Sequence, residues 1–263
     1  MSDAPRIEAR KEGAIGWLIF DNPARRNAVS VGMWESLPKA LEDFAADPQV
    51  RVVVLAGAGD KAFVSGADIS QFEAQRSGPE TVQRYEEIAE SAQARLQRFD
   101  KPTLAMIRGY CLGAGLNIAS ACDLRIAADD ARIGIPAAKM GLGYRASSTK
   151  NLIDVAGAAN AREILLTGRQ FSAAEAKAMG LVHHVVPVSE LQGFTEKLCG
   201  ELAANAPLTM RTAKRIIREL LRSPGEFDAT QAKAWVRECF DSADYAEGRK
   251  AFMEKRKPVF TGR

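Results

Sequence analysis

The chain has 263 residues, of which 46% are apolar and 26% are charged. A chain of this length can bury a hydrophobic core without disulfides, and its composition excludes a disordered, collagen-like or membrane protein. The 36 Lys and Arg residues exceed the 33 Asp and Glu residues by three, which gives a net charge of +3. This small, interspersed charge does not indicate a nucleic acid or an anionic membrane surface as the main partner.

The four cysteines are far apart in the sequence and form neither a C-x-x-C pair nor a group with histidine at metal-ligand spacing. This pattern predicts neither a zinc site nor a disulfide framework, and it is typical of reduced thiols in the cytoplasm. The first residues lack the apolar run of a signal peptide, and the longest apolar candidate, Leu104–Ala121, is interrupted by Arg108 and Asn117. We therefore expect a cytoplasmic protein with no metal and no membrane segment.

Strand and helix patterns alternate through the first half of the chain. Ile15–Phe20 is typical of a strand, Val31–Ala45 of an amphipathic helix, and Val50–Ala56 of a strand that is buried on both faces. A long helix over Pro79–Phe99 and a buried strand over Thr103–Ile107 are predicted next. This order predicts βαβ units, with parallel strands and crossover helices.

The pattern changes along the second half of the chain. A further strand is predicted near Leu124–Ala127, and Ser172 begins a capping box that starts a short helix, which is followed by a strand ending at Pro187. Beyond that strand about seventy residues are helical, with breaks at Pro207 and Ser223–Gly225. The predicted fold class is therefore α/β, with a helical appendage joined to the α/β body.

Two glycine-containing turns follow buried strands. The first, Lys61–Ile69, reads KAFVSGADI, and the second, Arg108–Asn117, reads RGYCLGAGLN and enters a helix. Glycine lets the backbone approach a ligand closely, and the free N–H groups of a helix's first turn attract an oxygen that carries negative charge. The turns are candidates for binding an anion or a polarised carbonyl, although turn chemistry alone also allows simple strand-to-helix connections.

Two further segments accompany these turns: Asp21–Ala28, which reads DNPARRNA, and Tyr245–Pro258, which reads YAEGRKAFMEKRKP. Together the four motifs resemble the crotonase (enoyl-CoA hydratase/isomerase) superfamily over essentially the whole chain. The resemblance implies a spiral of ββα units in residues 1–190 and a C-terminal helical region in residues 191–263 that supports trimerisation and contacts coenzyme A. It also implies a homotrimer or a dimer of trimers that binds an acyl-CoA substrate, with no tightly bound cofactor.

The resemblance places the thioester oxygen of the substrate between the backbone N–H groups of Ala67 and Ala114. A thioester enolate concentrates negative charge on this oxygen, and each such donor is worth about 2.7–4 kcal/mol of the barrier. For coenzyme A, the resemblance implies one group of residues at the pantetheine and phosphates, a second at the adenosine, and a third in the tail, often of a neighbouring subunit. In that order these residues are Ala24, Arg25 and Arg26; Ala28, Ala62, Asp68 and Ile69; and Phe252 and Lys255.

The chain departs from hydratases of this family at both positions of the catalytic acids. Hydratases use two glutamates to activate the added water, whereas this chain has Asn117 and Ala137 at the matching positions. Asn117 lies three residues after Ala114 and can point into the same pocket, but an amide does not take up a proton at neutral pH. Because general acid–base assistance is worth roughly 10²–10⁴-fold per group, we expect poor hydration unless other groups substitute.

A tyrosine and an arginine, Tyr144 and Arg145, follow the second of these positions. The segment is similar to the methylmalonyl-CoA decarboxylase branch, in which a tyrosine orients the substrate carboxylate and no glutamate is used, although that branch has a histidine in place of Ala67. Decarboxylation requires a carboxylate held out of the thioester plane and a site that stabilises the enolate. Tyr144 is thus a candidate to orient this carboxylate and Arg145 to attract it, against a structural tyrosine and a solvated arginine.

Three functions stay open on this sequence. The first is an acyl-CoA lyase, a decarboxylase or other carbon–carbon lyase, that stabilises a thioester enolate. The second is an enoyl-CoA hydratase or isomerase that recruits an unusual acid or base, such as a glutamate from a loop. The third is a catalytically silent protein that binds acyl-CoA. Turnover of crotonyl-CoA against malonyl-type thioesters, together with binding of coenzyme A, distinguishes them.

Three other patterns favour ordinary structural roles. Gly141–Ala146 matches G-x-G-x-x-A, but no β-branched strand precedes it and no acidic residue ends a second strand at Val155–Ala161, so no dinucleotide site is predicted. His183 and His184 alternate along a strand and point to opposite faces, which excludes joint binding of one metal. A basic helical stripe is expected to be a solvated face rather than an RNA-binding surface. It comprises Arg211, Arg215, Arg218 and Arg222.

Overall fold

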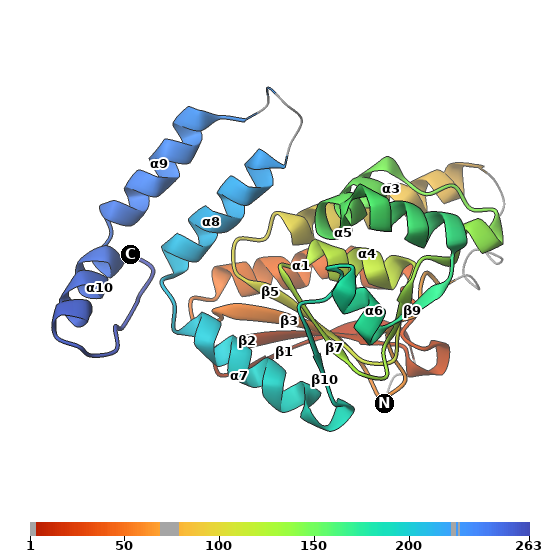
Figure 1. Cartoon of the computed structure of the whole chain (residues 1–263), viewed down its shortest axis with the longest axis horizontal. Coiled ribbons are helices and arrows are strands. Elements are labelled where there is room, and N and C mark those ends of the chain that lie inside the picture. Colours follow the sequence, from red (N-terminus) through yellow and green to blue (C-terminus); the bar gives the residue numbers. More distant parts are fainter. Residues whose placement is uncertain (1–3, 69–78, 222–224, 226) are drawn as a thin grey trace.

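The computed structural model describes residues 4–68, 79–221, 225 and 227–263. Its strands are β1 Arg6–Glu12, β2 Ile15–Asp21, β3 Val52–Gly57, β4 Ala62–Val64, β5 Thr103–Ile107, β6 Tyr110–Leu112, β7 Leu124–Ala128, β8 Arg132–Gly134, β9 Gln170–Ser172 and β10 His184–Val186. Its helices are α1 Val31–Ala46, α3 Pro79–Gln97, α4 Ala114–Ala121, α5 Ala146–Thr167, α6 Ala173–Ala178, α7 Leu191–Ala203, α8 Pro207–Leu220, α9 Ala229–Phe240 and α10 Ala243–Met253 (Figure 1).

The strands wind between two sheets. In the described residues, a six-stranded sheet has the order β1-β2-β3-β5-β7-β10, and a four-stranded sheet has the order β4-β6-β8-β9. Consecutive strands therefore alternate between the sheets. The larger sheet contains β3, β5 and β7, and the smaller sheet contains the strand that follows each of them, β4, β6 or β8. All pairings in the larger sheet are parallel except β1 with β2. This repetition is the spiral of ββα units that the sequence resemblance implied.

Strand β3 shows why the larger sheet is buried on both faces. Its β-branched run alternates between two hydrophobic clusters: Val53 faces the side covered by α1, whereas Val52 and Val54 face the side covered by α7. From α7, Leu191 and Cys199 complete that second cluster. Figure 1 shows α1 and α7 on opposite sides of the strands. Helix α7 therefore packs on the sheet although it lies just beyond residue 190, and the predicted domain boundary there stays a prediction.

Several predicted elements are confirmed. The strand at Thr103–Ile107 has the predicted bounds, and the helix predicted over Val31–Ala45 ends one residue later. The strands on either side of this helix, β2 and β3, pair in parallel as the βαβ prediction required. The capping box of Ser172 with Glu175 is also present: the Ser172 hydroxyl accepts from the Glu175 N–H at 3.3 Å, and the Glu175 carboxylate accepts from the Ser172 N–H at 2.8 Å.

Other elements were not predicted. Helix α5 spans the segment Val155–Ala161, for which the sequence pattern predicts no helix and offers only the place of a second strand. Its buried apolar residues, Leu152 and Ala156 on one side and Ala161 and Ile164 on the other, are divided by Gly157, which interrupts the helix with a φ of 76°, a conformation that favours glycine. Strand β1 was missed because it is a polar, largely exposed edge strand, and the strands of the smaller sheet are only three residues long.

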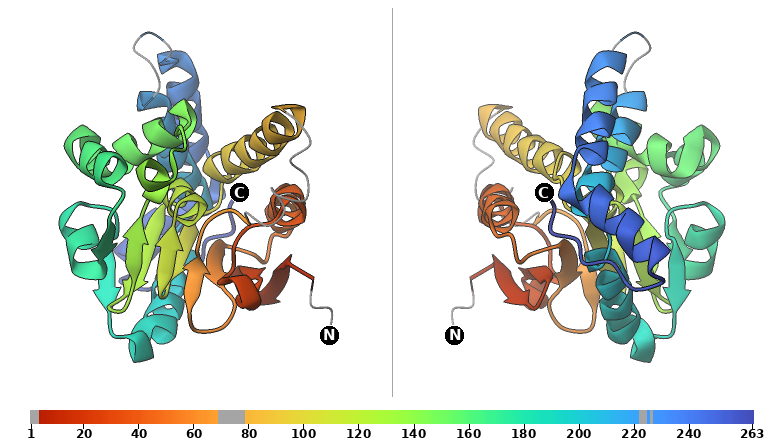
Figure 2. Two further views of the ribbon diagram at one scale, coloured as in Figure 1. Left: turned by 90° about the vertical axis from the view of Figure 1, so that its right-hand side faces the viewer. Right: turned by 90° about the vertical axis from the view of Figure 1, so that its left-hand side faces the viewer.

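Helices α8, α9 and α10 extend from one side of the body (Figures 1 and 2). Polar contacts hold α8 there: the Lys214 ammonium lies 2.6 Å from an Asp123 carboxylate oxygen, and the Arg215 guanidinium pairs with Asp100 at 2.5 Å. The basic stripe predicted to be a solvated face is therefore partly a docking surface, and its Arg211 also pairs with Glu238 at 2.5 Å. The last residue of the stripe, at position 222, lies outside the described residues.

The end of the chain folds back onto the start of α10. The buried Asp244 carboxylate accepts hydrogen bonds from the Thr261 N–H at 2.7 Å and the Gly262 N–H at 2.8 Å. The Arg51 guanidinium, which precedes β3, donates to the Phe260 carbonyl at 3.2 Å. These contacts tie the terminal segment both to α10 and to the body of the molecule.

The features predicted from the cysteines, histidines and apolar runs have the following outcomes. All four cysteines are free thiols, three of them buried. Across the part of the chain that the structure describes, no helix combines the length and apolar character needed to cross a membrane, and no group of three or more metal-ligating side chains forms. The His183 Nδ1 accepts a hydrogen bond from the Arg125 N–H at 3.1 Å, and the His184 ring packs against Phe194.

Candidate active site

The first glycine turn is held against the loop that follows β2. The Val29 N–H donates to the Gly66 carbonyl at 2.9 Å, and the Asp68 N–H donates to the Val29 carbonyl at 3.0 Å, so Val29 forms a parallel bridge with Ala67. In a parallel bridge one residue bonds to the two neighbours of its partner, here Val29 to Gly66 and Asp68. The partner between them, Ala67, turns its own N–H to the opposite side. The N–H of Ala67 therefore points away from this loop.

The second turn leads directly into α4. Gly113 precedes the helix with φ 53° and ψ −111°, a left-handed conformation that glycine adopts without steric cost. Ala114 is the first helical residue, so its N–H belongs to the group that has no acceptor within the helix. A side chain at Gly115 would place a Cβ 2.1 Å from the Val64 carbonyl oxygen, which shows how closely α4 approaches β4.

The two turns lie side by side. A Cβ built on Gly113 would lie 3.9 Å from the Gly66 Cα, and one built on Gly66 would lie 3.8 Å from the Leu112 carbonyl oxygen. Strands β4 and β6, which lead into the turns, are also paired neighbours in the smaller sheet. Among the described residues, no acceptor is found for the N–H of Ala67 or of Ala114. Two backbone N–H groups without an acceptor among the described residues thus lie in neighbouring turns.

Asn117 is the polar side chain one helical turn beyond Ala114. It is only 6% exposed, and its side-chain amide has two partners: the Tyr144 hydroxyl donates to its Oδ1, and its Nδ2 donates to the Ser148 Oγ at 3.3 Å. Burial raises the pKa of Tyr144, so its phenol is neutral at physiological pH. The structure therefore brings together Asn117 and Tyr144, which lie 27 residues apart in the sequence.

The other two predicted pocket residues have different surroundings. Ala137 is buried at 6% exposure in the 3₁₀ turn Pro136–Met140, and it presents only a methyl group at the position where a carboxylate was considered. Arg145 is half-buried and directly precedes α5, and its guanidinium donates to the Glu86 backbone carbonyl of α3 at 2.8 Å. Arg145 thus connects α5 to α3 and lies close enough to Tyr144 for its charge to act on the phenol.

A second tyrosine lies near this group and was not among the predicted residues. The Trp34 indole N–H donates to the Tyr85 hydroxyl at 2.9 Å, and Tyr85 lies close enough to Arg145 and Asp68 for their charges to act on it. Burial raises the pKa of Tyr85. The sequence carried a signal for this residue, because Tyr85 occurs on the apolar stripe of α3, where a polar hydroxyl needs a partner. Ser148 had no comparable signal.

The loop Asp21–Ala28, which the resemblance assigns to coenzyme A, is organised by asparagines. The Asn27 Nδ2 donates to the Ala62 carbonyl at 2.7 Å and to the Ala58 carbonyl at 2.9 Å, while its Oδ1 accepts from the Asn22 N–H at 3.1 Å. Asn27 itself has a positive φ of 58°. Its side chain therefore fixes the loop between the end of β3 and the start of β4.

Six of the predicted coenzyme A residues lie in or beside this loop. Ala24 and both arginines are exposed, whereas Ala28 and Ala62 are buried. The Arg25 guanidinium pairs with the buried Asp68 carboxylate at 2.8 Å, and the Arg26 guanidinium lies 4.9 Å from the centre of the Tyr110 ring. The loop therefore presents two cations beside the first glycine turn. The seventh predicted residue, Ile69, lies outside the described residues.

The two predicted residues of the tail are far from this group within one chain. Phe252 is 82% exposed near the end of α10, and Lys255 follows it with a φ of 53°. Figure 1 shows α10 at one end of the molecule, away from α4 and α5 in the body. One chain alone does not bring these residues to the glycine turns.

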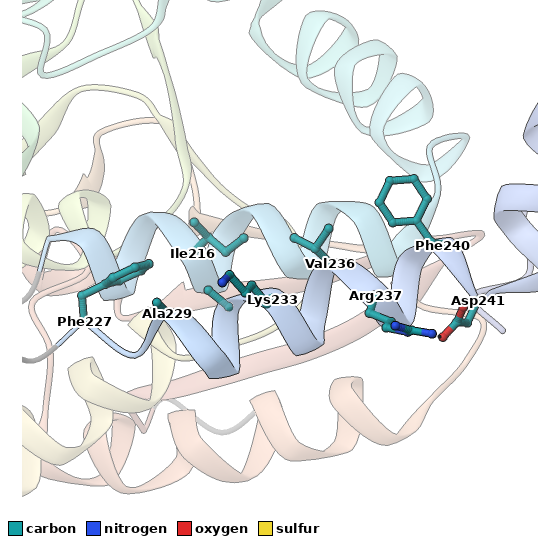
Figure 3. Close-up of a pocket in the computed structure, with 9 residues that line it drawn as sticks. Ile216, Phe227, Ala229, Lys233, Val236, Arg237, Phe240 and Asp241 are labelled. Carbon is teal, nitrogen blue, oxygen red and sulfur yellow. Dashed lines mark ion pairs between the residues drawn. The ribbon is translucent and has the colours of Figure 1, made fainter.

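Two cavities lie beside the C-terminal helices. One, of about 580 Å³, is an apolar groove between α8 and α9 that is lined by Ile216, Phe227, Val236 and Phe240, with the Arg237–Asp241 ion pair at its end (Figure 3). The other, of about 960 Å³, separates α8 from the body and includes Lys214 and Ser147 in its walls. Neither cavity is lined by Ala67, Ala114 or Tyr144.

The chain matches a known family over nearly its full length. The family described as "Enoyl-CoA hydratase/isomerase" matches residues 10–263. A putative enoyl-CoA hydratase from Thermus thermophilus is 37% identical over 254 residues, which cover 95% of this chain and 98% of that protein. The 2,3-dehydroadipyl-CoA hydratase of Escherichia coli is 31% identical over 246 residues, which cover 94% of each protein.

Solved structures give the same result. The crystal structure of an enoyl-CoA hydratase/carnithine racemase from Magnetospirillum magneticum has a TM-score of 0.92 and 37% sequence identity, and the match covers 100% of this chain and 97% of that chain. An enoyl-CoA hydratase from Bacillus anthracis has a TM-score of 0.89 and 29% identity, with 98% and 99% covered. The fold, the paired glycine turns and these likenesses agree: the chain belongs to the enoyl-CoA hydratase/isomerase family, the crotonase superfamily.

Proposed function

We propose that this acyl-CoA enzyme is a decarboxylase or another carbon–carbon lyase that stabilises a thioester enolate with the Ala67 and Ala114 N–H groups. One observation carries the proposal: Asn117, at a position where the resemblance expects a catalytic acid, is bonded to the neutral phenol of Tyr144. Neither an amide nor a neutral phenol takes a proton from water at neutral pH. The pair suits a reaction that needs orientation of the substrate rather than general base catalysis.

The proposed step balances without a base. The bond between the α-carbon and its carboxylate breaks, carbon dioxide leaves, and the electron pair moves through the α-carbon into the thioester carbonyl. The resulting enolate oxygen accepts hydrogen bonds from the Ala67 and Ala114 N–H groups, each worth about 2.7–4 kcal/mol of barrier. A proton from solvent then completes the α-carbon. Tyr144 orients the departing carboxylate, and the charge of Arg145 beside it favours an anionic acyl group.

We further propose that the loop between β2 and α1 binds the coenzyme A part of the substrate, through Ala24, Arg25, Arg26 and Ala28. The exposed guanidinium groups of Arg25 and Arg26 suit phosphate groups, since arginine forms charge-assisted hydrogen bonds with phosphate oxygens. Ala62 and Asp68 lie directly behind this loop. In this proposal the coenzyme A thioester is the substrate and no other cofactor takes part.

The proposed assembly is a homotrimer or a dimer of trimers formed through the C-terminal helices. Two observations support it: the groove between α8 and α9 exposes apolar side chains (Figure 3), and Phe252 and Met253 are 82% and 80% exposed on α10. Contact with a second copy would cover these side chains. It would also bring Phe252 and Lys255 to a neighbour's coenzyme A site, which they do not reach within their own chain. Light scattering of the purified protein measures the subunit number.

A second candidate is an enoyl-CoA hydratase with a different acid or base. It is favoured by the names of the relatives, which include a short-chain-enoyl-CoA hydratase and a crotonyl-CoA hydratase. A hydratase must activate a water molecule, and Asn117 and Ala137 supply no base for that step. A third candidate, a protein that binds acyl-CoA without turnover, follows if no group assists either reaction.

Turnover of two thioesters by the purified chain tests these candidates. The first substrate is methylmalonyl-CoA, with release of carbon dioxide and formation of propionyl-CoA as the readouts. The second is crotonyl-CoA, with loss of its conjugated double bond as the readout. We expect the first reaction to exceed the second in kcat/KM. Rapid hydration of crotonyl-CoA without decarboxylation overturns the proposal in favour of the hydratase, and calorimetric binding of coenzyme A without either reaction overturns it in favour of the silent protein.

A further inference from the structure

Three buried polar side chains form a chain of hydrogen bonds beside the glycine turns. The Tyr144 hydroxyl donates to the Asn117 Oδ1, and the Asn117 Nδ2 donates to the Ser148 Oγ at 3.3 Å. Asn117 and Ser148 are 6% and 3% exposed, and Tyr144 is half-buried. Ser148 lies in the first turn of α5 and contacts the Asn117 Nδ2, whereas Tyr144 contacts the Oδ1.

This arrangement limits what Tyr144 can offer to a ligand. A phenol has one O–H donor, and here that donor is used by the Asn117 Oδ1. Toward any other neighbour the Tyr144 oxygen therefore presents only acceptor lone pairs. A carboxylate is itself only an acceptor, so in this arrangement the phenol cannot hold the carboxylate that the proposed function gives it to orient.

A half-turn of the Asn117 amide removes this conflict. The amide oxygen and nitrogen exchange positions, so the Nδ2 donates to the Tyr144 oxygen and the Oδ1 accepts from the Ser148 hydroxyl. A serine hydroxyl serves equally as donor or acceptor, and the two orientations of an amide differ little in shape. Both hydrogen bonds are kept, while the Tyr144 O–H becomes free to point to a ligand.

We infer that Ser148 is a positioning residue that lets the Asn117 amide turn, so that Tyr144 donates its hydrogen bond to a carboxylate on the acyl group of the substrate. The inference rests on the proposed function and deepens it, because it names the group of the substrate that drives the turn. A thioester without that carboxylate leaves the amide in the orientation seen here. In this inference the substrate is an acyl-CoA whose acyl group carries one free carboxylate besides the thioester.

The residue types fit this role. Alanine at position 148 would leave the Asn117 amide without this partner in either orientation and so would no longer hold it toward Tyr144, and a site only 3% exposed leaves little room for water to replace the hydroxyl. Threonine would keep the hydroxyl. Ser147, the preceding residue, is exposed on the same helical turn and lines the cavity below α8, so it offers a matched control.

Four proteins test the inference: wild type, Ser148→Ala, Ser148→Thr and Ser147→Ala. The probes are methylmalonyl-CoA, as the substrate with the carboxylate, and propionyl-CoA, which lacks only that carboxylate. We expect Ser148→Ala to lower kcat/KM for methylmalonyl-CoA by about 10- to 100-fold, the value of one hydrogen bond to a charged group. The Kd of propionyl-CoA should stay within about twofold of wild type, because it makes no such bond. Ser148→Thr should recover most of the lost activity, and Ser147→Ala should match wild type.

A merely structural role for Ser148 predicts a different pattern. Ser148→Ala would then weaken propionyl-CoA binding and methylmalonyl-CoA turnover by the same factor, and that result overturns the inference while the proposed function stands. Unchanged turnover in Ser148→Ala overturns it in the same way. If wild type itself fails to decarboxylate methylmalonyl-CoA and binds it no better than propionyl-CoA, both the proposed function and the inference fall.

Discussion

The Arg25 guanidinium lies 2.8 Å from the carboxylate of Asp68, 43 residues further along the chain. The Asp68 side chain is 4% exposed and that of Arg25 is 50% exposed, so the ion pair runs from the interior to the surface. Asp68 directly follows Ala67, and Arg25 belongs to the loop proposed to bind coenzyme A. One ion pair therefore connects the loop to the first of the two backbone donors.

Asp68→Asn should affect both ends of this connection. The substitution removes the carboxylate charge from this ion pair, and we expect the free energy of unfolding to fall by about 1–3 kcal/mol, as for the loss of a charged hydrogen bond. The KM for an acyl-CoA substrate should rise because Arg25 loses its orientation. Chemical denaturation and steady-state kinetics measure the two effects. Asp60→Asn, an exposed site that undergoes the same charge change, is the control, and equal effects in both variants would contradict the prediction.

Ala114→Pro removes one backbone donor without removing a side chain that contacts the ligand. Ala114 is the first residue of α4, a position where proline fits because its N–H is not needed by the helix. We expect kcat to fall by about 10²–10³-fold, the cost of one lost oxyanion donor, while the helix content stays unchanged. Circular dichroism and turnover of the active substrate give the two measurements.

The matched control for this variant is Ala243→Pro, at the exposed first position of α10. It changes the same residue type at the same helical position, away from the glycine turns. Full activity in Ala243→Pro and in Ala114→Pro would show that the Ala114 N–H does not act on the reacting oxygen.

Tyr144→Phe should separate orientation of the substrate from enolate stabilisation. The variant keeps the ring and loses the hydroxyl that bonds to Asn117. We expect decarboxylation of methylmalonyl-CoA to fall by about 10- to 100-fold, with propionyl-CoA binding preserved. Because burial raises the pKa of Tyr144 above its usual value of about 10, the phenol should stay protonated and wild-type activity should show no loss from its ionisation up to pH 9. Tyr245→Phe, on the exposed helix α10, is the control; a variant at position 144 with wild-type kinetics would remove Tyr144 from the mechanism.

Glu175 should make the stability of the protein sensitive to acid. Hydrogen bonds from the Ser172 N–H and from Arg169 lower the pKa of Glu175 to about 2. The unfolded chain, in which a glutamate has its usual pKa of about 4.3, takes up the proton first as the pH falls. This contribution is therefore fully present above the unfolded pKa and is lost as the pH falls toward about 2.

Thermal melts from pH 7 to pH 2 test this prediction. Glu175→Gln should have a lower Tm than wild type at neutral pH, and the difference should shrink as the medium becomes acidic. Glu196→Gln, an exposed glutamate on α7, should follow the wild-type curve. A constant difference between wild type and Glu175→Gln at every pH would assign the effect to packing instead of charge.

The sequence predicts best where a residue's own neighbours determine its structure. The β-branched run Val52–Val54 reads as a buried strand because both of its faces are apolar, and the glycines of the two turns mark conformations that other residues avoid. The four family motifs then predict one fold that contains both turns. By contrast, Gly157 divides the buried apolar residues of α5 into two groups, so the sequence alone gives a weak sign of one continuous helix.

The polar network of the site was less accessible to sequence reasoning. The Trp34–Tyr85 bond joins residues 51 positions apart, and the Asn117–Ser148 bond joins residues 31 positions apart. Nothing local at Ser148 distinguishes it from Ser147. Such pairs depend on how α1, α3, α4 and α5 pack, which is a property of the whole fold.

Strands β4 and β6 lie next to each other in the smaller sheet, and one backbone donor follows each of them within a few residues. Backbone pairing of two strands, at the usual spacing of about 4.8 Å, therefore brings the two turns side by side without the help of any side chain. In the proposed site, substitutions at positions such as 117, 137 and 144 would then alter which bond of the acyl group is broken or formed, while the hydrogen bonds to its carbonyl oxygen persist. In such a fold, side chains beside the acyl group can change the reaction without any change in the two backbone turns.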